Sequence, residues 1–291
     1  MNKIPYIFFG TGPIARFVLE ELERAQLTPA LIVTSPDMPQ GRKLELAPSP
    51  VKIWADTHSI ETLQPEELDA AFLSTLIDRT KALTAPVYVV TDYGKILPQA
   101  LLDIPPRGIL NVHPSLLPRL RGPSPIRSAI LTNEKETGVT VMLIDAKMDH
   151  GPILSQKRMT IEPWPPHATH LEETLAREGG RLLATVLPLW VREEIEAREQ
   201  QHDLATFCKM IKKEHAQISL SDDAYTNLLK IRAYEGWPIA FTYFQRGDKK
   251  IRVQILDAHI KAGMLIIERV KPEGKNEMEF QEFMKSGATP V

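Results

Sequence analysis

Cysteine is almost absent from this chain of 291 residues, because Cys208 is the only one. A single thiol excludes both a disulfide framework and a cysteine-rich metal site. No stretch of the sequence approaches the ~20 apolar residues of a membrane-spanning helix, and the apolar run near the N-terminus is too short for a secretory signal. With 43% hydrophobic and 25% charged residues, the chain can bury a core, which excludes a disordered protein. We therefore expect a globular protein of the cytoplasm.

Short apolar runs alternate with helical patterns over the first two thirds of the sequence. Runs of strand length occur at 5–10, 30–35, 85–90, 108–113 and 138–145. Helical patterns occur at 13–25, 96–103, 125–133 and 167–195, and 193–201 have the composition of a polar helical tail. Strands that alternate with helices predict an α/β fold with a doubly wound, mostly parallel sheet.

The pattern changes after about residue 195. Short alternating runs follow at 239–245, 250–259 and 263–270, separated by turn residues, and they predict a small antiparallel β-barrel. We expect a domain over 1–190, a linker over 191–208 and a second domain over 209–291. Residues 1–204 carry a net negative charge and 205–291 a net positive one, which weakly favours an anionic partner at the second domain.

A glycine-rich turn, Gly10-Thr11-Gly12, follows the first predicted strand and precedes a helix. A dinucleotide-binding fingerprint occupies the same place in other folds. However, Pro13 removes an N–H group from the start of the helix, and no acidic residue closes the second predicted strand. We therefore favour a tight strand-to-helix turn over a nicotinamide site.

Three polar side chains are predicted to meet at one edge of the sheet. Asn111 and His113 lie two residues apart in a buried strand, so they share a face, and Asp149 follows the next predicted strand. An amide and a protonated imidazole can both donate hydrogen bonds to an oxyanion. A carboxylate can orient the imidazole and accept a proton from an attacking amine. The trio suits direct acyl transfer between two substrates, while a strand cap and a plain turn remain an equally simple interpretation.

Several motifs carry a resemblance to a known family. Residues 113–122 read HPSLLPRLRG, with Asn111 before them, and GTGP (10–13), PSPVK (48–52), DYGKILP (92–98), ETGVTVMLID (136–145) and MDHGPIL (148–154) stand around them. WPIAF (237–241) and VKPEGKNEM (270–278) extend the match to the C-terminal part. In this order and spacing the motifs resemble the 10-formyltetrahydrofolate-dependent formyltransferases, and among them the methionyl-tRNA formyltransferases, over nearly the whole chain.

The resemblance implies roles for particular residues. It implies that Asn111, His113 and Asp149 are catalytic. It also implies that a folate-binding set lines the donor site, with the last two of its members near the pteridine: Ser115, Leu116, Leu117, Pro118, Ile96 and Leu97. Arg42 and Lys43, in a proline-rich loop, match positions that approach the acceptor end of a tRNA.

The resemblance also implies the substrates. The formyl donor is 10-formyltetrahydrofolate, the acceptor is initiator methionyl-tRNA, and no metal is required. The N-terminal domain is expected to be doubly wound without a dinucleotide, and the C-terminal domain to be a barrel of the OB type that helps to hold the tRNA. We expect a cytoplasmic monomer without a membrane partner.

Some positions depart from the family pattern. Leu120 replaces the usual aromatic residue between two arginines, and Asp92 replaces alanine and adds a charge near the expected pteridine pocket. These departures affect the details of substrate and folate affinity. Two alternatives to the tRNA enzyme, which share its core or its fold, also stay open: a nucleotide-sugar N-formyltransferase, and a non-catalytic folate- or RNA-binding homologue.

Overall fold

The computed structural model describes residues 4–40 and 45–291. The chain forms two compact units. The first comprises Met1–Arg121, Gly138–Arg158 and Glu173–Phe207, and the second Gly122–Thr137, Met159–Glu172 and Cys208–Val291. In the part of the chain that is described, no helix is long and apolar enough to cross a membrane.

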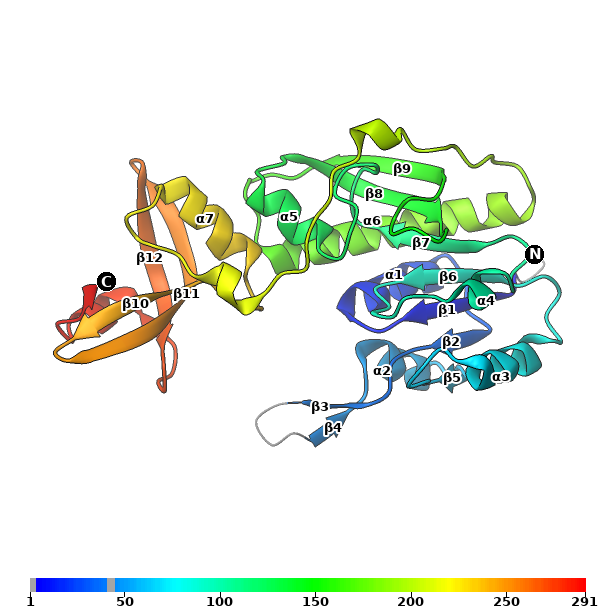
Figure 1. Cartoon of the computed structure of the whole chain (residues 1–291), viewed down its shortest axis with the longest axis horizontal. Coiled ribbons are helices and arrows are strands. Elements are labelled where there is room, and N and C mark those ends of the chain that lie inside the picture. Colours follow the sequence, from blue (N-terminus) through cyan, green and yellow to red (C-terminus); the bar gives the residue numbers. More distant parts are fainter. Residues whose placement is uncertain (1–3, 41–44) are drawn as a thin grey trace. The chain divides into compact units, whose positions relative to one another are not determined.

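The main sheet has seven strands in the order β5-β2-β1-β6-β7-β8-β9 (Figure 1). Their bounds are β1 Tyr6–Gly10, β2 Leu31–Val33, β5 Thr62–Leu63, β6 Val87–Thr91, β7 Ile109–His113, β8 Glu136–Leu143 and β9 Ile153–Thr160. The strands from β5 to β7 pair in parallel, whereas β8 runs antiparallel to β7. The predicted α/β fold with a mostly parallel sheet is confirmed.

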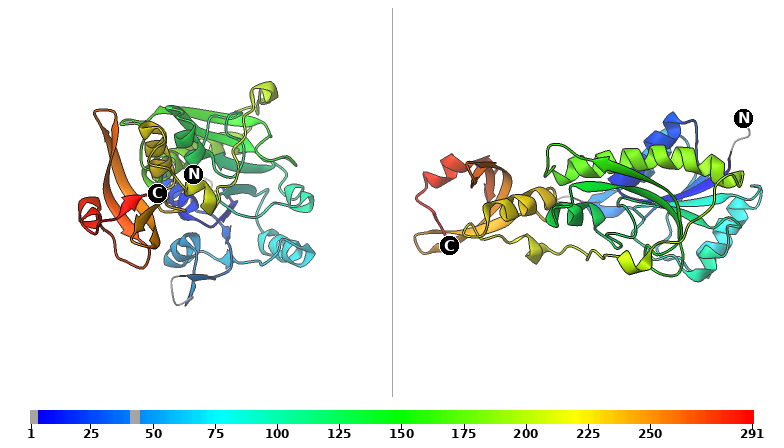
Figure 2. Two further views of the ribbon diagram at one scale, coloured as in Figure 1. Left: turned by 60° about the vertical axis from the view of Figure 1, so that its left-hand side comes forward. Right: turned by 90° about the horizontal axis from the view of Figure 1, so that it is seen from above.

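Helices cover both faces of this sheet (Figure 1). Helices α1 (Pro13–Arg24), α2 (Pro50–Thr57) and α6 (Ala168–Val191) contribute to one core, in which Phe8 and Val112 are buried. Helices α3 (Ala70–Thr80) and α4 (Gln99–Leu102) pack on the other face, where Phe9 and Ile109 are buried. Figure 2 shows α6 extended along the sheet. Strand residues therefore alternate between two buried layers, as continuous apolar runs predict.

Helix α4 is shorter than the predicted helix at 96–103, because Pro98 is its N-cap. Proline lacks an N–H group, and it disfavours helical backbone at the residue before it, so the helix starts only at Gln99. Residues 92–98 form an irregular loop instead.

The predicted helical tail at 193–201 is wrong. Glu193 has a φ of 60°, which ends the α6 segment in a left-handed turn. The chain then continues without an α-helix, and Arg198 exchanges backbone hydrogen bonds with Ile153 at the start of β9 (2.9 and 2.7 Å). We call residues 194–207 the strap. A short 3-10 helix within it spans His202–Leu204.

The second unit carries an antiparallel sheet, in the order β13-β12-β11-β10-β14, and helices α5 (Pro125–Leu131), α7 (Ala224–Ala233) and α8 (Phe280–Met284). Its strands are β10 Phe241–Arg246, β11 Lys249–Lys261, β12 Met264–Pro272, β13 Met278–Glu279 and β14 Thr289–Pro290 (orange and red in Figure 2). Phe244, Val253 and Phe283 are buried in one of its cores. The predicted C-terminal antiparallel β-structure is confirmed.

Candidate active site

Strand β7 presents Asn111 and His113 on one face. Leu110 and Val112 point into the core beneath α1, α2 and α6, so the alternation of the strand directs the two polar side chains to the opposite face. His113 is 4% exposed and Asn111 is half-buried. The predicted common face for these two residues is confirmed by this register.

His113 lies between two partners. Its Nε2 atom is 3.1 Å from the carbonyl oxygen of Leu120. A carbonyl only accepts hydrogen bonds, so Nε2 carries a hydrogen and donates it. The Nδ1 atom is 3.6 Å from Oδ1 of Asp149, whose side chain is 15% exposed. The structure therefore brings together two of the three residues for which a catalytic role is predicted.

Asp149 reaches His113 by a route that the sequence did not indicate. Because β8 is antiparallel to β7, its last residue, Leu143, pairs with Leu110 near the start of β7. The loop 144–152 must therefore return toward the end of β7. Asp149 has a φ of 50° in this loop. A Cβ atom on Gly151 would lie 2.1 Å from the Leu143 carbonyl oxygen, so glycine is required for the loop to pack against the strand.

A buried amide supports this loop. Gln200 of the strap, 5% exposed, donates from Nε2 to the carbonyl oxygens of Asp149 (3.0 Å) and Gly151 (2.7 Å). Its Oε1 atom accepts from Nε (3.1 Å) and Nη2 (2.6 Å) of Arg121, which is 3% exposed. Sequence reasoning missed Gln200, and no local signal could have found it, since it lies 51 residues from Asp149.

The predicted folate-binding residues occupy two loops at the ends of β6 and β7. Ser115 donates to the Arg119 carbonyl (2.6 Å), and the Leu117 amide donates to Thr140 on β8 (3.2 Å), so the segment after β7 is firmly held. In the loop after β6, Ile96 is 90% exposed, whereas Leu97 is half-buried and packs beside Leu101 and Tyr93.

Tyr93, in the same loop, is buried without a hydrogen-bond partner for its hydroxyl among the described residues. Burial raises the pKa of Tyr93 to about 12, so the side chain is neutral at physiological pH. An unsatisfied buried hydroxyl beside the predicted pteridine loop can be paired by a polar substrate group.

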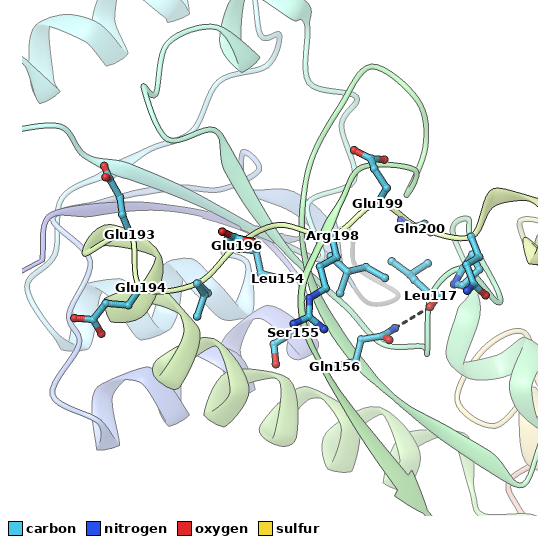
Figure 3. A pocket seen from close by; sticks show the side chains of 14 residues that line it. Leu117, Leu154, Ser155, Gln156, Glu193, Glu194, Glu196, Arg198, Glu199 and Gln200 are labelled. Atoms are coloured by element: carbon cyan, nitrogen blue, oxygen red, sulfur yellow. Dashed lines mark hydrogen bonds between the residues drawn. The ribbon is translucent and has the colours of Figure 1, made fainter.

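A pocket of about 900 Å³ lies between β9 and the strap (Figure 3). Arg198 extends from the strap toward Ser155 and Gln156 of β9, and Gln156 Nε2 donates to the Leu117 carbonyl (2.8 Å). Among the predicted site residues that the structure describes, this pocket is lined by Leu117 and Pro118 and by none of the predicted catalytic groups. The candidate site therefore rests on the geometry around His113 rather than on this hollow.

The side chain of Asp92 occupies the space beside the glycine-rich turn. A Cβ atom on Gly12 would lie 2.1 Å from Oδ2 of Asp92, so that carboxylate lies against the first turn of α1. A carboxylate is favoured at a helix N-terminus, but it repels the phosphates that a dinucleotide would place there. The charge of Asp92 is directed to α1, and this supports the interpretation of 10–13 as a tight turn.

Arg42 and Lys43, the predicted tRNA contacts, lie outside the described residues. They fall between β3 (Met38–Gln40) and β4 (Glu45–Ala47), which pair as an antiparallel hairpin. Over residues 4–40 and 45–291, no group of three His, Cys, Asp or Glu side chains is arranged to hold a metal ion.

Comparison with known proteins identifies the family. Residues 2–187 match the model of the formyl transferase family. A methionyl-tRNA formyltransferase of Chloroflexus aurantiacus is 45% identical over 239 residues, which cover 82% of this chain and 76% of that protein. Another, from Methylacidiphilum infernorum, is 35% identical and covers 98% of this chain and 96% of that protein.

Solved structures share the fold. A methionyl-tRNA formyltransferase from Clostridium thermocellum aligns with a TM-score of 0.61 at 15% identity, over 92% of this chain and 98% of that one. A sugar 3N-formyl transferase aligns with the same TM-score, 0.61, at 16% identity, over 95% of this chain and 100% of that one. The fold alone therefore does not separate the two acceptor classes. The sequence relatives do, because the proteins that are 45% and 35% identical to this chain are methionyl-tRNA formyltransferases. The chain belongs to the formyl transferase family and, within it, to the methionyl-tRNA formyltransferases.

Proposed function

We propose that this chain transfers the formyl group of 10-formyltetrahydrofolate to the α-amino group of methionine on initiator tRNA, with Asn111, His113 and Asp149 as its catalytic residues. The observation that carries the residue assignment is the approach of His113 Nδ1 to Asp149 Oδ1, at 3.6 Å, at the end of the strand that also presents Asn111.

The reaction needs stabilisation of an oxyanion and removal of a proton. The neutral amine attacks the formyl carbon, a carbon–nitrogen bond forms, and the formyl oxygen becomes negatively charged. Asn111 donates a hydrogen bond to that oxygen, and such donors are typically worth about 10²–10³ in rate. The two ring N–H groups of a protonated His113 face Leu120 and Asp149, so the imidazolium stabilises the oxyanion through its positive charge. Asp149 stabilises the imidazolium and takes the proton lost by the amine. When the intermediate collapses, the bond between the formyl carbon and the folate nitrogen breaks. That nitrogen takes up the proton that Asp149 accepted from the amine, which returns Asp149 to its carboxylate form.

The loops around this centre provide the substrate contacts in the proposal. The donor is held by the segment Ser115, Leu116, Leu117 and Pro118 and by Ile96 and Leu97. The near-complete exposure of Ile96 supports this role, since an apolar side chain that is 90% exposed gains from burial by a ligand. Arg42 and Lys43 contact the acceptor end of the tRNA.

The proposal extends to the oligomeric state and the location of the protein. We propose that it acts as a monomer in the cytoplasm, where its tRNA substrate is used in translation initiation. Light scattering during size-exclusion chromatography tests the monomer, since a mass well above the 32.8 kDa of one chain would contradict it.

A formyl-transfer assay tests the acceptor. Charged initiator methionyl-tRNA, charged elongator methionyl-tRNA and free methionine are compared with 10-formyltetrahydrofolate as donor, and Asp149→Asn serves as the impaired control. We expect turnover on the initiator tRNA alone. Turnover on a nucleotide-linked amino sugar, and on none of the methionyl acceptors, would replace the tRNA with a sugar acceptor. Tight folate binding without any transfer would indicate a non-catalytic homologue.

A further inference from the structure

We propose that Gln200 is the positioning residue for Asp149, and that the strap therefore belongs to the catalytic centre rather than acting as a passive connection. This inference rests on the proposed role of Asp149. It concerns a side chain that itself contacts neither the imidazole nor, in the proposed mechanism, either substrate.

The first observation is that Gln200 uses both of its amide hydrogens on the catalytic loop. They go to the carbonyl oxygens of Asp149 at 3.0 Å and Gly151 at 2.7 Å, one on each side of His150. Asp149 has a left-handed backbone (φ 50°), which is uncommon for a residue with a side chain and persists only where the surroundings impose it. The two hydrogen bonds fix the peptide groups that define this turn.

The second observation is that the orientation of the Gln200 amide is itself imposed. Oε1 accepts two hydrogen bonds from Arg121, through Nε and Nη2. If the amide were flipped, its NH₂ group would face a guanidinium that cannot accept, and its oxygen would face two carbonyl oxygens. The charge of Arg121 also polarises the amide, and this strengthens the donation to the loop.

The third observation ties the other member of the catalytic pair to the same place. His113 donates from Nε2 to the carbonyl of Leu120, the residue next to Arg121. Thr206 of the strap holds this dipeptide, because its Oγ1 accepts from the Leu120 amide (2.8 Å) and its carbonyl from the Arg121 amide (2.9 Å). Leu120 therefore anchors the imidazole directly, and the adjacent Arg121 anchors the backbone of Asp149 through Gln200.

Gln200→Glu separates positioning from folding. The glutamate keeps an acceptor for Arg121 but removes both donors to the loop. We expect kcat to fall about 100-fold, the scale expected for misplacement of a reacting group by about 1 Å, while KM for each substrate changes less than about threefold. The matched control is Gln201→Glu, which adds the same charge at the exposed neighbouring residue and should leave kcat unchanged.

A second variant guards against a simple loss of folding. Gln200→Met has a similar length but also leaves the buried Arg121 without its amide acceptor, so its melting temperature should fall below that of Gln200→Glu. If kcat in the two variants and the control simply follows melting temperature, the role is structural and the inference is wrong.

A double-mutant cycle with Asp149→Asn identifies the path of the effect. If Gln200 acts through Asp149, Gln200→Glu should cost less than about threefold in the Asp149→Asn background, because residues that act as a unit are strongly non-additive. An undiminished 100-fold loss in that background would overturn the inference. Full activity of Asp149→Asn itself would instead overturn the proposed catalytic role. An impaired Asp149→Asn beside a fully active Gln200→Glu would overturn only the role of Gln200.

Discussion

The two halves of the catalytic pair are held in different ways. His113 lies at the end of a buried strand, and its Nε2 partner, Leu120, is seven residues away in the same motif. Asp149 lies in an irregular loop whose support, Gln200, is 51 residues away and is anchored in turn by Arg121, 79 residues from it. The first half is specified mainly by local sequence and strand register, with one brace from Thr206 of the strap to Leu120. The second half depends on contacts that form only when distant segments have packed.

The largest predicted effect comes from removing the groups on the locally held side. Asn111→Ala should lower kcat about 10²–10³-fold, the usual cost of losing one oxyanion donor, and its melting temperature should stay close to that of the unmodified chain. His113→Ala removes the positive charge beside the oxyanion and should lower kcat on the same scale. Steady-state kinetics with initiator methionyl-tRNA measure this. A loss confined to KM would show that Asn111 binds substrate equally well in the ground and transition states.

The loop of Asp149 should be sensitive to its own backbone. A Cβ atom on Gly151 would meet the Leu143 carbonyl at 2.1 Å, so Gly151→Ala must displace the loop from β8. We expect a loss of about 1–3 kcal/mol in the free energy of unfolding and a fall in kcat of at least about tenfold. Urea denaturation and single-turnover kinetics check the two effects. Unchanged kinetics in a destabilised variant would show that the position of Asp149 does not depend on this turn.

Thr206→Val tests how local the support of His113 is. The substitution removes the hydroxyl that accepts from the Leu120 amide, while the backbone bond from Arg121 to residue 206 stays. We expect a cost of about 0.5–1.5 kcal/mol for the loss of this partly buried hydrogen bond and a kcat about tenfold lower. Thermal melts and kcat at a temperature well below the transition separate these effects. A kcat equal to that of the unmodified chain would show that the motif holds His113 without the strap.

The smallest effect is expected far from both halves. Asp69 accepts a hydrogen bond from the Phe72 amide (2.9 Å) and caps α3. Asp69→Ala should cost about 1 kcal/mol of stability, the typical value for an N-cap, and should not change kcat. Chemical denaturation and the formyl-transfer assay measure the two quantities. A lower kcat in this variant would mean that a general loss of stability is enough to disturb the site.

The sequence predicts the elements whose pattern is strong. The buried runs that became β1, β6 and β7 and the amphipathic segments that became α1 and α6 were all predicted, because each buries a continuous apolar run or face. By contrast, β9 lies outside the predicted ranges. Most of its residues are polar and at least partly exposed, so it lacks the hydrophobic run of the central strands.

The candidate site was likewise predictable only in part: its three proposed catalytic residues were, but the segments that support them were not. Register alone places Asn111 and His113 on a common face, and the motif resemblance points to Asp149. Neither the antiparallel direction of β8 nor the non-helical strap could be predicted from the local sequence pattern.

The strap shows how tertiary contacts override local preference. Glu196 and Glu199 are good helix formers, but the backbone hydrogen bonds between Arg198 and Ile153 and the buried amide of Gln200 override that preference. Tertiary contacts of this kind are not visible in a single sequence.

The late position of the strap in the chain has a consequence for biosynthesis. A nascent chain of 190 residues already contains every strand of the main sheet, together with His113 and Asp149. It lacks Gln200 and Thr206, which emerge later and must close contacts over 51 and 86 residues. Because contacts that are distant in sequence form late and slowly, the sheet can fold on the ribosome before the catalytic geometry exists. An arrested intermediate of that length should thus be folded and inactive.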